Sequence, residues 1–320
     1  MRRLVSALLV ASLLALVLGA SAFAGNGGFG PEAPVSPNAS RINDAYWLIF
    51  GFTAFVFVVV ESALVWFVIR YRRRGRPRDA EGMQIHGSTR LEVAWTVVPV
   101  LILAAIGAFV FYKLPGIKDV PSARAGEQLT VQVQAHQFYW EFRYPNGQLS
   151  VDTMVVPAGR VVRLEVTTPD VAHSWWIPRL GGKIDAIPGR VNTTWFQTDR
   201  LGTYPGQCAE FCGLYHAAMR ANVVVVAPEQ FSGFLSSHGA GSAAVGKETF
   251  TGACAKCHGS LGQGAYGPKI AGNATLADRQ ALEQLLREGK GRMPAVGKDW
   301  PDAQIDALFR DLKGRFSSGG

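Results

Sequence analysis

The positions of apolar residues divide the chain into membrane-type segments and a soluble region. Residues 46–69 are almost continuously apolar, and at about 1.5 Å per residue they extend about 36 Å, enough to cross a bilayer. A second apolar stretch covers residues 93–114 and contains Pro99, which a spanning helix tolerates where neighbouring groups satisfy the backbone. The pattern predicts a transmembrane helical hairpin within residues 43–116.

The N-terminal segment has the pattern of an export signal. A pair of arginines precedes an apolar stretch at residues 4–18, and a small-x-small cleavage pattern ends at Ala24. We expect residues 1–24 to be a signal peptide; an uncleaved anchor helix is the alternative, although the apolar stretch is short for a span. Residues 25–42 are rich in Gly, Pro, Ser and Asn, which predicts a flexible lead-in.

A strand pattern begins near residue 129. Apolar and polar positions alternate there, aromatic β-prone residues follow, and Asn146-Gly147 is a strong hairpin signal. The strand-like segments are residues 129–136, 138–144, 161–168, 191–197 and 221–226. Several short strands separated by turn residues predict a β-sandwich or barrel over residues 117–232. The small residues of 233–244 then predict a linker.

Composition and charge support this division. The hydrophobic fraction is 48%, which is high for a soluble protein and agrees with membrane segments joined to soluble domains. The formal net charge is +8, but an arginine cluster at residues 70–78 lies directly beside the first apolar stretch. By the positive-inside rule this cluster places the hairpin loop in the cytoplasm, so both ends of the hairpin lie outside. The chain has no nucleic-acid-binding motif, and we expect no nucleic-acid partner.

Four side chains that bind soft metals lie within residues 208–219. They are Cys208, Cys212, His216 and Met219, and His173 offers a second imidazole upstream. Thiolate, thioether and imidazole ligands favour copper over magnesium or calcium. These ligands exceed the needs of one small ion, whereas two thiolates can bridge a pair of coppers, each completed by one imidazole and one weaker ligand. Such a site transfers electrons and leaves no open position for hydrolysis.

The segment Cys254-Ala-Lys-Cys257-His258 is the attachment signature of haem c. Its thiols bond covalently to the haem, and its imidazole ligates the iron. Met293 is the candidate for the second axial ligand, which raises the redox potential as in cytochromes c. The alternatives are structural disulfides between the four cysteines, a thioredoxin-type redox pair or a zinc half-site. The accompanying His and Met residues oppose them, and we expect a haem-binding domain at residues 245–320.

With these motifs together, the chain resembles subunit II of haem-copper cytochrome c oxidases, in the bacterial form with a cytochrome c domain fused to its C-terminus. The resemblance extends from about Asp44 to the C-terminus. It implies a multidomain membrane protein with a two-helix transmembrane hairpin, a cupredoxin-like β-sandwich or barrel that holds the dinuclear copper centre CuA, and an all-α class I cytochrome c domain. The implied function is to pass electrons from haem c to CuA and on to subunit I, where oxygen is reduced to water and protons are pumped.

The implied enzyme is the whole oxidase, an oxidoreductase and translocase whose oxygen-reducing site lies in a partner subunit, so no catalytic residue is expected in this chain. Expected partners are subunits I and III, reduced cytochrome c or a similar donor, and membrane lipid. The implied location is the bacterial inner membrane, with the N- and C-terminal domains on the periplasmic face. Two alternatives remain: a membrane-anchored copper-delivery or thiol-redox assembly factor, and the corresponding subunit of another haem-copper reductase.

The resemblance also assigns roles to residues by motif. The CuA ligands would be His173, Cys208, Glu210 through its backbone carbonyl, Cys212, His216 and Met219. The Glu210 carboxylate would also reach a magnesium ion shared with subunit I; its alternative is an exposed loop acid. Glu92 matches the acid at the entrance of a proton channel into subunit I, although the helix dipole also favours an acid at a helix start. The haem c residues would be Cys254 and Cys257 as covalent attachments, with His258 and Met293 as axial ligands.

One aromatic position departs from the family pattern. Phe138 stands where the family commonly has a tryptophan proposed to receive electrons from soluble cytochrome c. A fused cytochrome makes reception of external electrons at CuA unnecessary. Phe138, Tyr139 and Trp140 are the candidate electron-transfer aromatics, and core packing is the alternative role for the latter two.

Overall fold

The computed structural model describes residues 30–316 apart from residues 73, 74, 76, 78, 80, 83, 85, 123 and 125. The expected signal peptide at residues 1–24 and the first part of the lead-in lie outside the described residues. The chain forms two compact units: one contains Asn43–Leu114, and the other contains Pro34–Ile42 and Pro115–Gly320.

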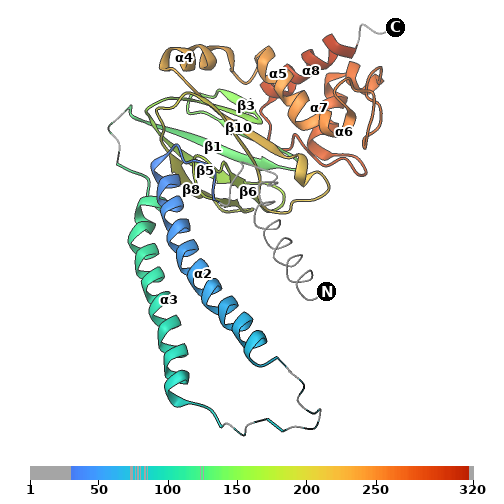
Figure 1. Cartoon of the computed structure of the whole chain (residues 1–320). Helices are drawn as coiled ribbons and strands as arrows, with labels where there is room; N and C mark the ends of the chain where they lie inside the picture. Colours follow the sequence, from blue (N-terminus) through green and yellow to red (C-terminus); the bar gives the residue numbers. More distant parts are fainter. Residues whose placement is uncertain are drawn as a thin grey trace, which may run out of the picture. The chain divides into compact units, whose positions relative to one another are not determined.

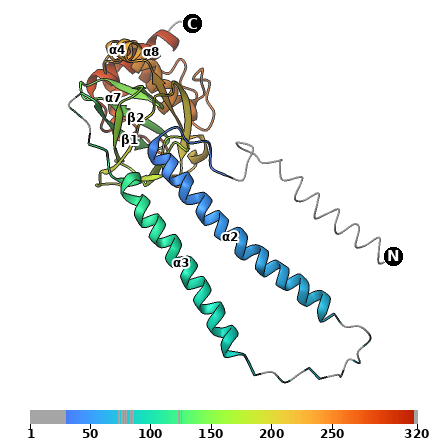
Figure 2. The same cartoon turned by 60° about the vertical axis from the view of Figure 1, so that its left-hand side comes forward.

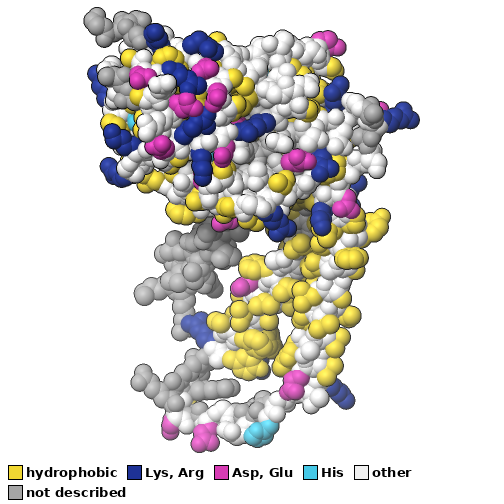
Figure 3. Space-filling model, turned by 180° about the vertical axis from the view of Figure 1, so that it is seen from behind, with side chains coloured by type: hydrophobic (Ala, Val, Ile, Leu, Met, Phe, Trp, Pro, Cys, Tyr) yellow, Lys and Arg dark blue, Asp and Glu magenta, His cyan; other side chains and the backbone are white. Residues whose placement is uncertain are grey.

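Two long apolar helices account for most of the first unit, α2 (Pro37–Arg70) and α3 (Thr89–Lys118), drawn in blue and green in Figures 1 and 2. Many of their apolar side chains are exposed, and Figure 3 shows this hydrophobic surface. By length and composition both helices can cross a membrane. They extend beyond the spans expected at 46–69 and 93–114 because hydropathy marks only the apolar part of a helix, whereas backbone hydrogen bonding continues into its polar ends.

The start of α2 differs from the flexible lead-in that was expected there. Ser36 precedes the helix, and its Oγ accepts a hydrogen bond from the Ala39 N–H at 3.3 Å, while Pro37 is the first helical residue. Asn38 is buried, and its amide donates to the Trp195 carbonyl at 2.5 Å. The Ser, Pro and Asn residues that predicted a loop therefore start a helix, and its first turn packs within the second unit.

The second unit contains two five-stranded sheets. Their strand orders are β3-β2-β1-β5-β8 and β4-β10-β9-β6-β7. The strands are β1 (Gln128–His136), β2 (Tyr139–Arg143), β3 (Leu149–Val151), β4 (Thr153–Pro157), β5 (Val161–Thr167), β6 (His173–Trp176), β7 (Ile184–Ala186), β8 (Asn192–Phe196), β9 (Gly202–Cys208) and β10 (Arg220–Val226). The pairs β1–β5 and β4–β10 are parallel and need crossover connections, while the other pairs are antiparallel. This is the cupredoxin-like β-sandwich that the sequence predicted.

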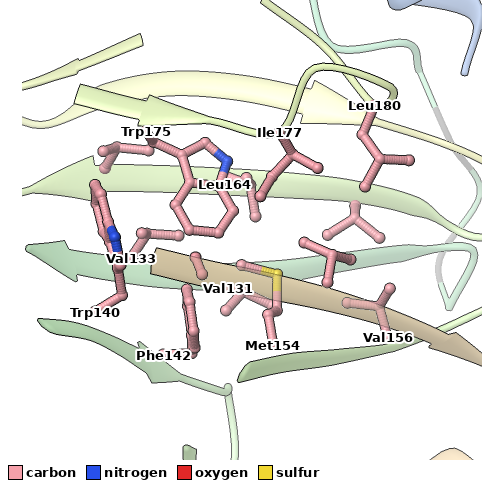
Figure 4. Close-up of a cluster of buried hydrophobic side chains, with 14 of the residues drawn as sticks. Val131, Val133, Trp140, Phe142, Met154, Val156, Leu164, Trp175, Ile177 and Leu180 are labelled. Carbon is pink, nitrogen blue, oxygen red and sulfur yellow. The ribbon is translucent and has the colours of Figure 1, made fainter. Parts of the chain in front are cut away.

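The core of the sandwich follows from the alternation of side chains along its strands (Figure 4). In β1, Val131 and Val133 are fully buried, and the residue between them is exposed. Trp140 and Phe142 of β2 pack edge-on against Trp175 of β6, with ring centroids 5.1 and 5.5 Å apart. This aromatic group lies at one end of the core shown in Figure 4, and its Trp140 ring packs against His173.

The C-terminal part of the second unit is helical. Its helices are α4 (Pro228–Ser237), α5 (Ala243–Thr249), η3 (Phe250–Cys254), α6 (Ala255–His258), η4 (Ala274–Ala277), α7 (Arg279–Glu288) and α8 (Asp302–Phe316). The segment between α4 and α5 is shorter than the linker expected at 233–244, because α4 continues to Ser237. Helices α5 and α8 approach closely at Gly246, where a Cβ atom would collide with the Ala307 backbone. The all-α domain expected in this region is thus present.

Candidate copper and haem sites

The sandwich brings the predicted soft ligands together from three segments. His173 is the first residue of β6, and Cys208 is the last residue of the neighbouring strand β9. The β9–β10 loop carries Cys212 and His216, and Met219 directly precedes β10. The loop is closed at its base, where the Cys208 N–H donates to the Met219 carbonyl at 2.9 Å.

Each cysteine sulfur in this cluster lies next to one imidazole. Cys208 Sγ is 3.8 Å from His173 Nδ1, and Cys212 Sγ is 3.6 Å from His216 Nδ1. The two sulfurs are 4.0 Å apart, far beyond the bond length of about 2.05 Å in a disulfide, and both thiols are free. Met219 Sδ lies 3.8 Å from Cys212 Sγ. A metal ion with thiolate bonds of about 2.3 Å can reach both sulfurs across this gap.

The Glu210 backbone also belongs to this cluster, because its carbonyl oxygen is 3.2 Å from Cys208 Sγ. Its carboxylate is exposed and lies 3.9 Å from Lys183 Nζ. Lys183 is also paired with Asp185 at 2.6 Å. The two functional groups of Glu210 therefore face different surroundings, with the carbonyl at the sulfurs and the side chain at the surface.

Asp170, which the sequence did not single out, orients His173. Its Oδ1 is 2.9 Å from His173 Nε2, so the other ring nitrogen faces Cys208. Burial works against ionisation of both groups, but their mutual hydrogen bond and the further hydrogen bonds of each group together outweigh it. The pKa of Asp170 is consequently lowered to about 2, and the pKa of His173 is raised. A carboxylate three residues before a candidate ligand is the signal that could have identified it.

The two thiols differ in acidity because they share one hydrogen bond. The hydrogen bond between the Cys208 and Cys212 sulfurs, with further bonds to His173 and backbone groups, lowers the pKa of Cys208 to about 3 despite burial. The same interaction, together with burial, raises the pKa of Cys212. Cys208 is therefore a thiolate at neutral pH, the form that binds a soft metal.

The cluster is buried on one side and open to an apolar surface on the other. His173 and Met219 are fully buried, and the Trp140 ring packs against His173 with centroids 6.3 Å apart. On the open side, Phe211 is 77% exposed and Leu214 is 65% exposed. Phe211 also packs against the half-buried His216 ring. These exposed apolar side chains lie on the loop that carries Cys212 and His216 and give it a surface suited to a protein contact.

Glu92 lies in the first turn of α3 and is exposed. Its Oε1 accepts a hydrogen bond from the Ser88 backbone N–H at 3.3 Å. This contact satisfies a backbone donor at the helix start, as an acid in the first turn is expected to do. The geometry within this chain therefore shows the helix-start role of Glu92.

The C-terminal domain contains a cavity of about 700 Å³ at the haem-attachment signature. Cys254, Cys257, His258 and Met293 all line it, together with the leucines Leu276, Leu282, Leu285, Leu286, Leu308 and Leu312. A cavity of this size and apolar lining fits a large flat cofactor. The four predicted haem c residues are thus brought together around one space.

Two features hold the His258 ring in this cavity. Its Nδ1 is 2.7 Å from the Pro268 carbonyl oxygen, which leaves the other nitrogen free to bind a metal. Gly267 packs on the ring, since a Cβ there would lie 2.8 Å from two ring atoms. Burial raises the pKa of Cys254 to about 12 and also raises that of Cys257. Both thiols are therefore protonated at neutral pH, unlike the low-pKa thiolate of a thioredoxin-type pair.

The three predicted aromatics lie in different environments. Phe138 lines the cavity together with Gln137, whose amide donates to the Cys212 carbonyl at 2.6 Å. Tyr139 is fully buried against the helical domain, and its hydroxyl donates to the Val296 carbonyl at 2.8 Å. Trp140 contacts His173, as described above. The cavity and the sulfur cluster are thus connected through Gln137.

Three family models match the chain in sequence order. A model described as "Cytochrome C oxidase subunit II, transmembrane domain" matches residues 26–112, and one described as "Cytochrome C oxidase subunit II, periplasmic domain" matches residues 146–227. A model described as "Cytochrome C oxidase, cbb3-type, subunit III" matches residues 241–310. These matches follow the order of the hairpin, the β-domain and the helical domain.

Individual proteins match over most of the chain. Cytochrome c oxidase subunit 2 of Alkalihalophilus pseudofirmus is 33% identical over 284 residues, covering 83% of this chain and 80% of that protein. Quinol oxidase subunit 2 of Bacillus subtilis is 30% identical over 236 residues, covering 73% of each chain. Among solved structures, the periplasmic domain of subunit II of cytochrome oxidase from Bradyrhizobium japonicum is 35% identical, with a TM-score of 0.34, and covers 37% of this chain and 96% of that one.

Proposed function

Because this chain belongs to the cytochrome c oxidase subunit II family and ends in a cytochrome c domain, we propose that electrons enter a terminal cytochrome c oxidase through it. A covalently bound haem c and the dinuclear copper centre CuA would relay these electrons toward subunit I. In that subunit, oxygen would be reduced to water with proton pumping. This chain has no oxygen-reducing site in this proposal.

One observation supports the proposal most strongly, namely the pairing of each cysteine sulfur with its own imidazole. Cys208 lies beside His173, and Cys212 lies beside His216. The Glu210 carbonyl lies beside the first sulfur and the Met219 thioether beside the second. The donor set therefore divides into two similar halves, each with one cysteine sulfur, one imidazole and one weaker donor, which would suit two metal ions.

The chain's own residues would prepare this site for electron transfer. Cys208 and Cys212 would hold the copper pair, which would supply a one-electron centre whose charge both ions share, so that little geometric change would be needed. Asp170 holds the His173 ring in place, and the Trp140 ring covers it. Burial of His173 and Met219 excludes water, which keeps solvent rearrangement small.

Four residues of the helical domain would hold the haem. Cys254 and Cys257 would attach it covalently, and His258 and Met293 would be its axial ligands. The group would supply a one-electron centre whose potential a methionine ligand raises. The Pro268 carbonyl fixes the His258 ring, and the leucines give the cavity a largely apolar wall.

The remaining assignments concern contacts with partner chains. We propose that the exposed Glu210 carboxylate binds a magnesium ion at the subunit I interface, and that Glu92 acts at the entrance of a proton channel into that subunit. Subunit III and a reduced cytochrome c or similar donor complete the expected partners. The hairpin would lie in the bacterial inner membrane, with both termini on the periplasmic side.

The main alternative functions have less support. A thiol-redox or copper-delivery factor would use a thioredoxin-like α/β fold, but the domain is a β-sandwich and is followed by a haem-attachment signature. The quinol oxidase relative raises a second possibility, in which quinol is the donor. The intact set of soft ligands favours a copper centre, and hence a cytochrome donor.

Replacing a bridging thiol in the assembled oxidase tests this assignment. Cys212→Ser should abolish oxidation of the reduced cytochrome donor and bleach the copper absorption, while the haem c spectrum stays unchanged. Wild-type turnover with quinol but not with reduced cytochrome would contradict the proposal. Full cytochrome turnover by Cys212→Ser would contradict it as well.

A further inference from the structure

The haem-attachment segment makes a direct contact with the β-domain through a lysine. Lys256 lies between the two attachment cysteines, and its Nζ is 2.6 Å from Asp152 Oδ2 and 2.8 Å from the Phe138 carbonyl oxygen. The side chains of this ion pair are 19% and 24% exposed. The ammonium therefore connects the haem-binding segment to the backbone of a residue that lines the same cavity.

Asp152 is itself fixed by the β-domain. Its Oδ1 accepts a hydrogen bond from the Trp140 backbone N–H at 2.9 Å, and its own N–H donates to the Trp140 carbonyl at 2.8 Å. Trp140 is fully buried in the sandwich and contacts His173. Lys256 is thus joined, through one carboxylate, to the strand that packs against a predicted copper ligand.

A second group of buried contacts strengthens the same interface. The Tyr139 hydroxyl donates to the Val296 carbonyl and accepts a hydrogen bond from Trp300 Nε1 at 2.9 Å. On the same strand, the fully buried Glu141 accepts a hydrogen bond at 3.1 Å from Gln304 of α8. Breaking such buried polar contacts leaves groups without partners, which destabilises the separated arrangement. These contacts specify one arrangement of the two domains.

The β-domain supplies part of the wall of the proposed haem cavity, so the position of the helical domain affects the shape of that cavity. Gln137, Phe138, Leu214 and Tyr215 line the cavity from the β-domain side, and Tyr215 packs against Tyr266 of the helical domain with ring centroids 5.7 Å apart. The Gln137 amide is hydrogen bonded to the Cys212 carbonyl. The cavity wall on this side is therefore built from the metal-binding loop and its support.

We propose that the cytochrome domain is docked in one fixed position on the β-domain and that Lys256 is the positioning residue that locks it there. The domain is not a tethered shuttle that must swing to deliver electrons. The functional part of this inference rests on the proposed function. Because one-electron transfer from iron to copper breaks no bond, a positioning residue such as Lys256 would act on it through the distance and contact between the two domains.

The test compares variants of the full-length chain in the assembled oxidase. Lys256→Gln removes the charge, and Asp152→Asn removes its partner without touching the attachment signature. Lys256→Arg is the conservative variant, and Lys247→Gln changes an exposed lysine of the same domain as a control. Hydrogen exchange is measured in β2, β3 and α8, and limited proteolysis is measured in the segment between α4 and α5. Internal reduction of copper is followed after photoreduction of the haem.

If Lys256 holds the two domains together, loss of its ion pair should change hydrogen exchange, proteolysis and internal electron transfer. Lys256→Gln and Asp152→Asn should expose the amides of β2 and β3 to faster exchange and speed cleavage of the connecting segment, with both metal spectra intact. Internal electron transfer should slow in proportion to the fraction of molecules that stay docked, by about tenfold where one tenth of them do. It should also become dependent on salt and viscosity. Lys256→Arg should restore both properties, and Lys247→Gln should match the wild type.

Failure of the proposed Lys256 contact and failure of the proposed function would give different results. Unchanged exchange, proteolysis and transfer rate in Lys256→Gln and Asp152→Asn would overturn the lock. Absence of the copper or haem spectrum from the wild-type protein would overturn the proposed function, while exchange and proteolysis would still decide whether Lys256 holds the domains together.

Discussion

At the scale of single residues, Asp170 has the greatest influence on the geometry of the sulfur cluster. It accepts hydrogen bonds from the His173 ring at 2.9 Å and from the Gln137 backbone N–H at 2.7 Å. A hydrogen bond to one ring nitrogen fixes the tautomer and the direction of the other. Asp170 therefore directs His173 Nδ1 towards Cys208. It also connects His173 to Gln137, whose amide donates to the Cys212 carbonyl.

Replacing this carboxylate should weaken metal binding without unfolding the domain. Asp170→Asn keeps the shape of the side chain but loses the charge that orients the ring, so copper affinity should fall by about 10- to 100-fold. Competition with a copper chelator measures the change. Asp199→Asn, at an exposed aspartate, is the control and should leave affinity unchanged. Equal affinities in both variants would show that Asp170 does not support the site.

The sequence predicted the soft ligands because most of them lie within one short segment whose spacing is readable. Asp170 was missed because its relation to His173 depends on the loop conformation. Tyr139 was predicted as an electron-transfer aromatic, and its hydroxyl contacts Val296 and Trp300, more than 150 residues further along the chain. No local pattern reveals such partners, since they exist only once the two domains meet.

At the scale of elements, the β9–β10 loop depends on a close approach at Gly213. This residue has φ +125°, and a Cβ there would lie 3.0 Å from Gln137 Nε2 and 3.2 Å from the Phe138 ring. Both the backbone conformation and the packing therefore favour glycine. The loop that carries Cys212 is held against the segment leading into β2.

Gly213→Ala should distort this loop. We expect a loss of about 1–3 kcal/mol in the free energy of unfolding from backbone strain, with additional loss of bound copper. Gly189→Ala is the matched control, because Gly189 has φ +74° but a Cβ atom there would meet no other atom within 4 Å. Chemical unfolding and copper content measure the two effects. Equal copper content in the two variants would mean that the close packing at Gly213 does not shape the site.

The segment between α4 and α5 contains a pH-sensitive contact. His238 Nε2 lies 3.2 Å from Glu248 Oε1, and although burial opposes it, this partner raises the pKa of His238 above 6.5. The stabilisation is therefore fully present below pH 6.5 and is lost as the pH rises through the higher folded-state pKa. Glu248 also accepts a hydrogen bond from the Val151 N–H, so the contact supports β3.

His238→Gln should remove this dependence. Thermal unfolding of wild type and variant between about pH 6 and pH 8 should show a difference that is largest at the acidic end and shrinks as the pH rises. Because the wild type and His238→Gln share every other titratable group, the difference in their stability at each pH reports the His238 contact. A difference that stays constant over this range, or that grows with pH, would contradict the assignment.

Elements were predicted where local pattern and tertiary environment agree. The alternating segment of β1 and the apolar segment of β10 were recognisable for this reason. Strand β9 was not, because its sequence contains Gly202, Pro205 and Gly206 and has low strand propensity. It forms nevertheless, since β10 and β6 pair with it on either side, and Pro205 lies opposite Asn222. Tertiary pairing outweighs local preference here.

At the scale of the whole molecule, the chain combines a membrane hairpin with a β-sandwich and a helical domain. The sequence predicted each part because each has its own pattern: apolar stretches, alternating strands and the haem-attachment signature. It could not predict how the helical domain docks on β2 and β3. That interface depends on pairs such as Lys256 and Asp152, which lie 104 residues apart in the chain.

In the proposed function, Cys208 and Cys212 hold two copper ions in a chain that also carries haem c. Near-infrared absorption and copper content of the purified full-length protein, measured with its visible haem spectrum, decide whether both centres are present. We expect a mixed-valence copper-pair band, a copper content that matches a dinuclear centre, and a c-type haem spectrum from the same molecule. Mononuclear copper, or no bound copper after reconstitution, would contradict it.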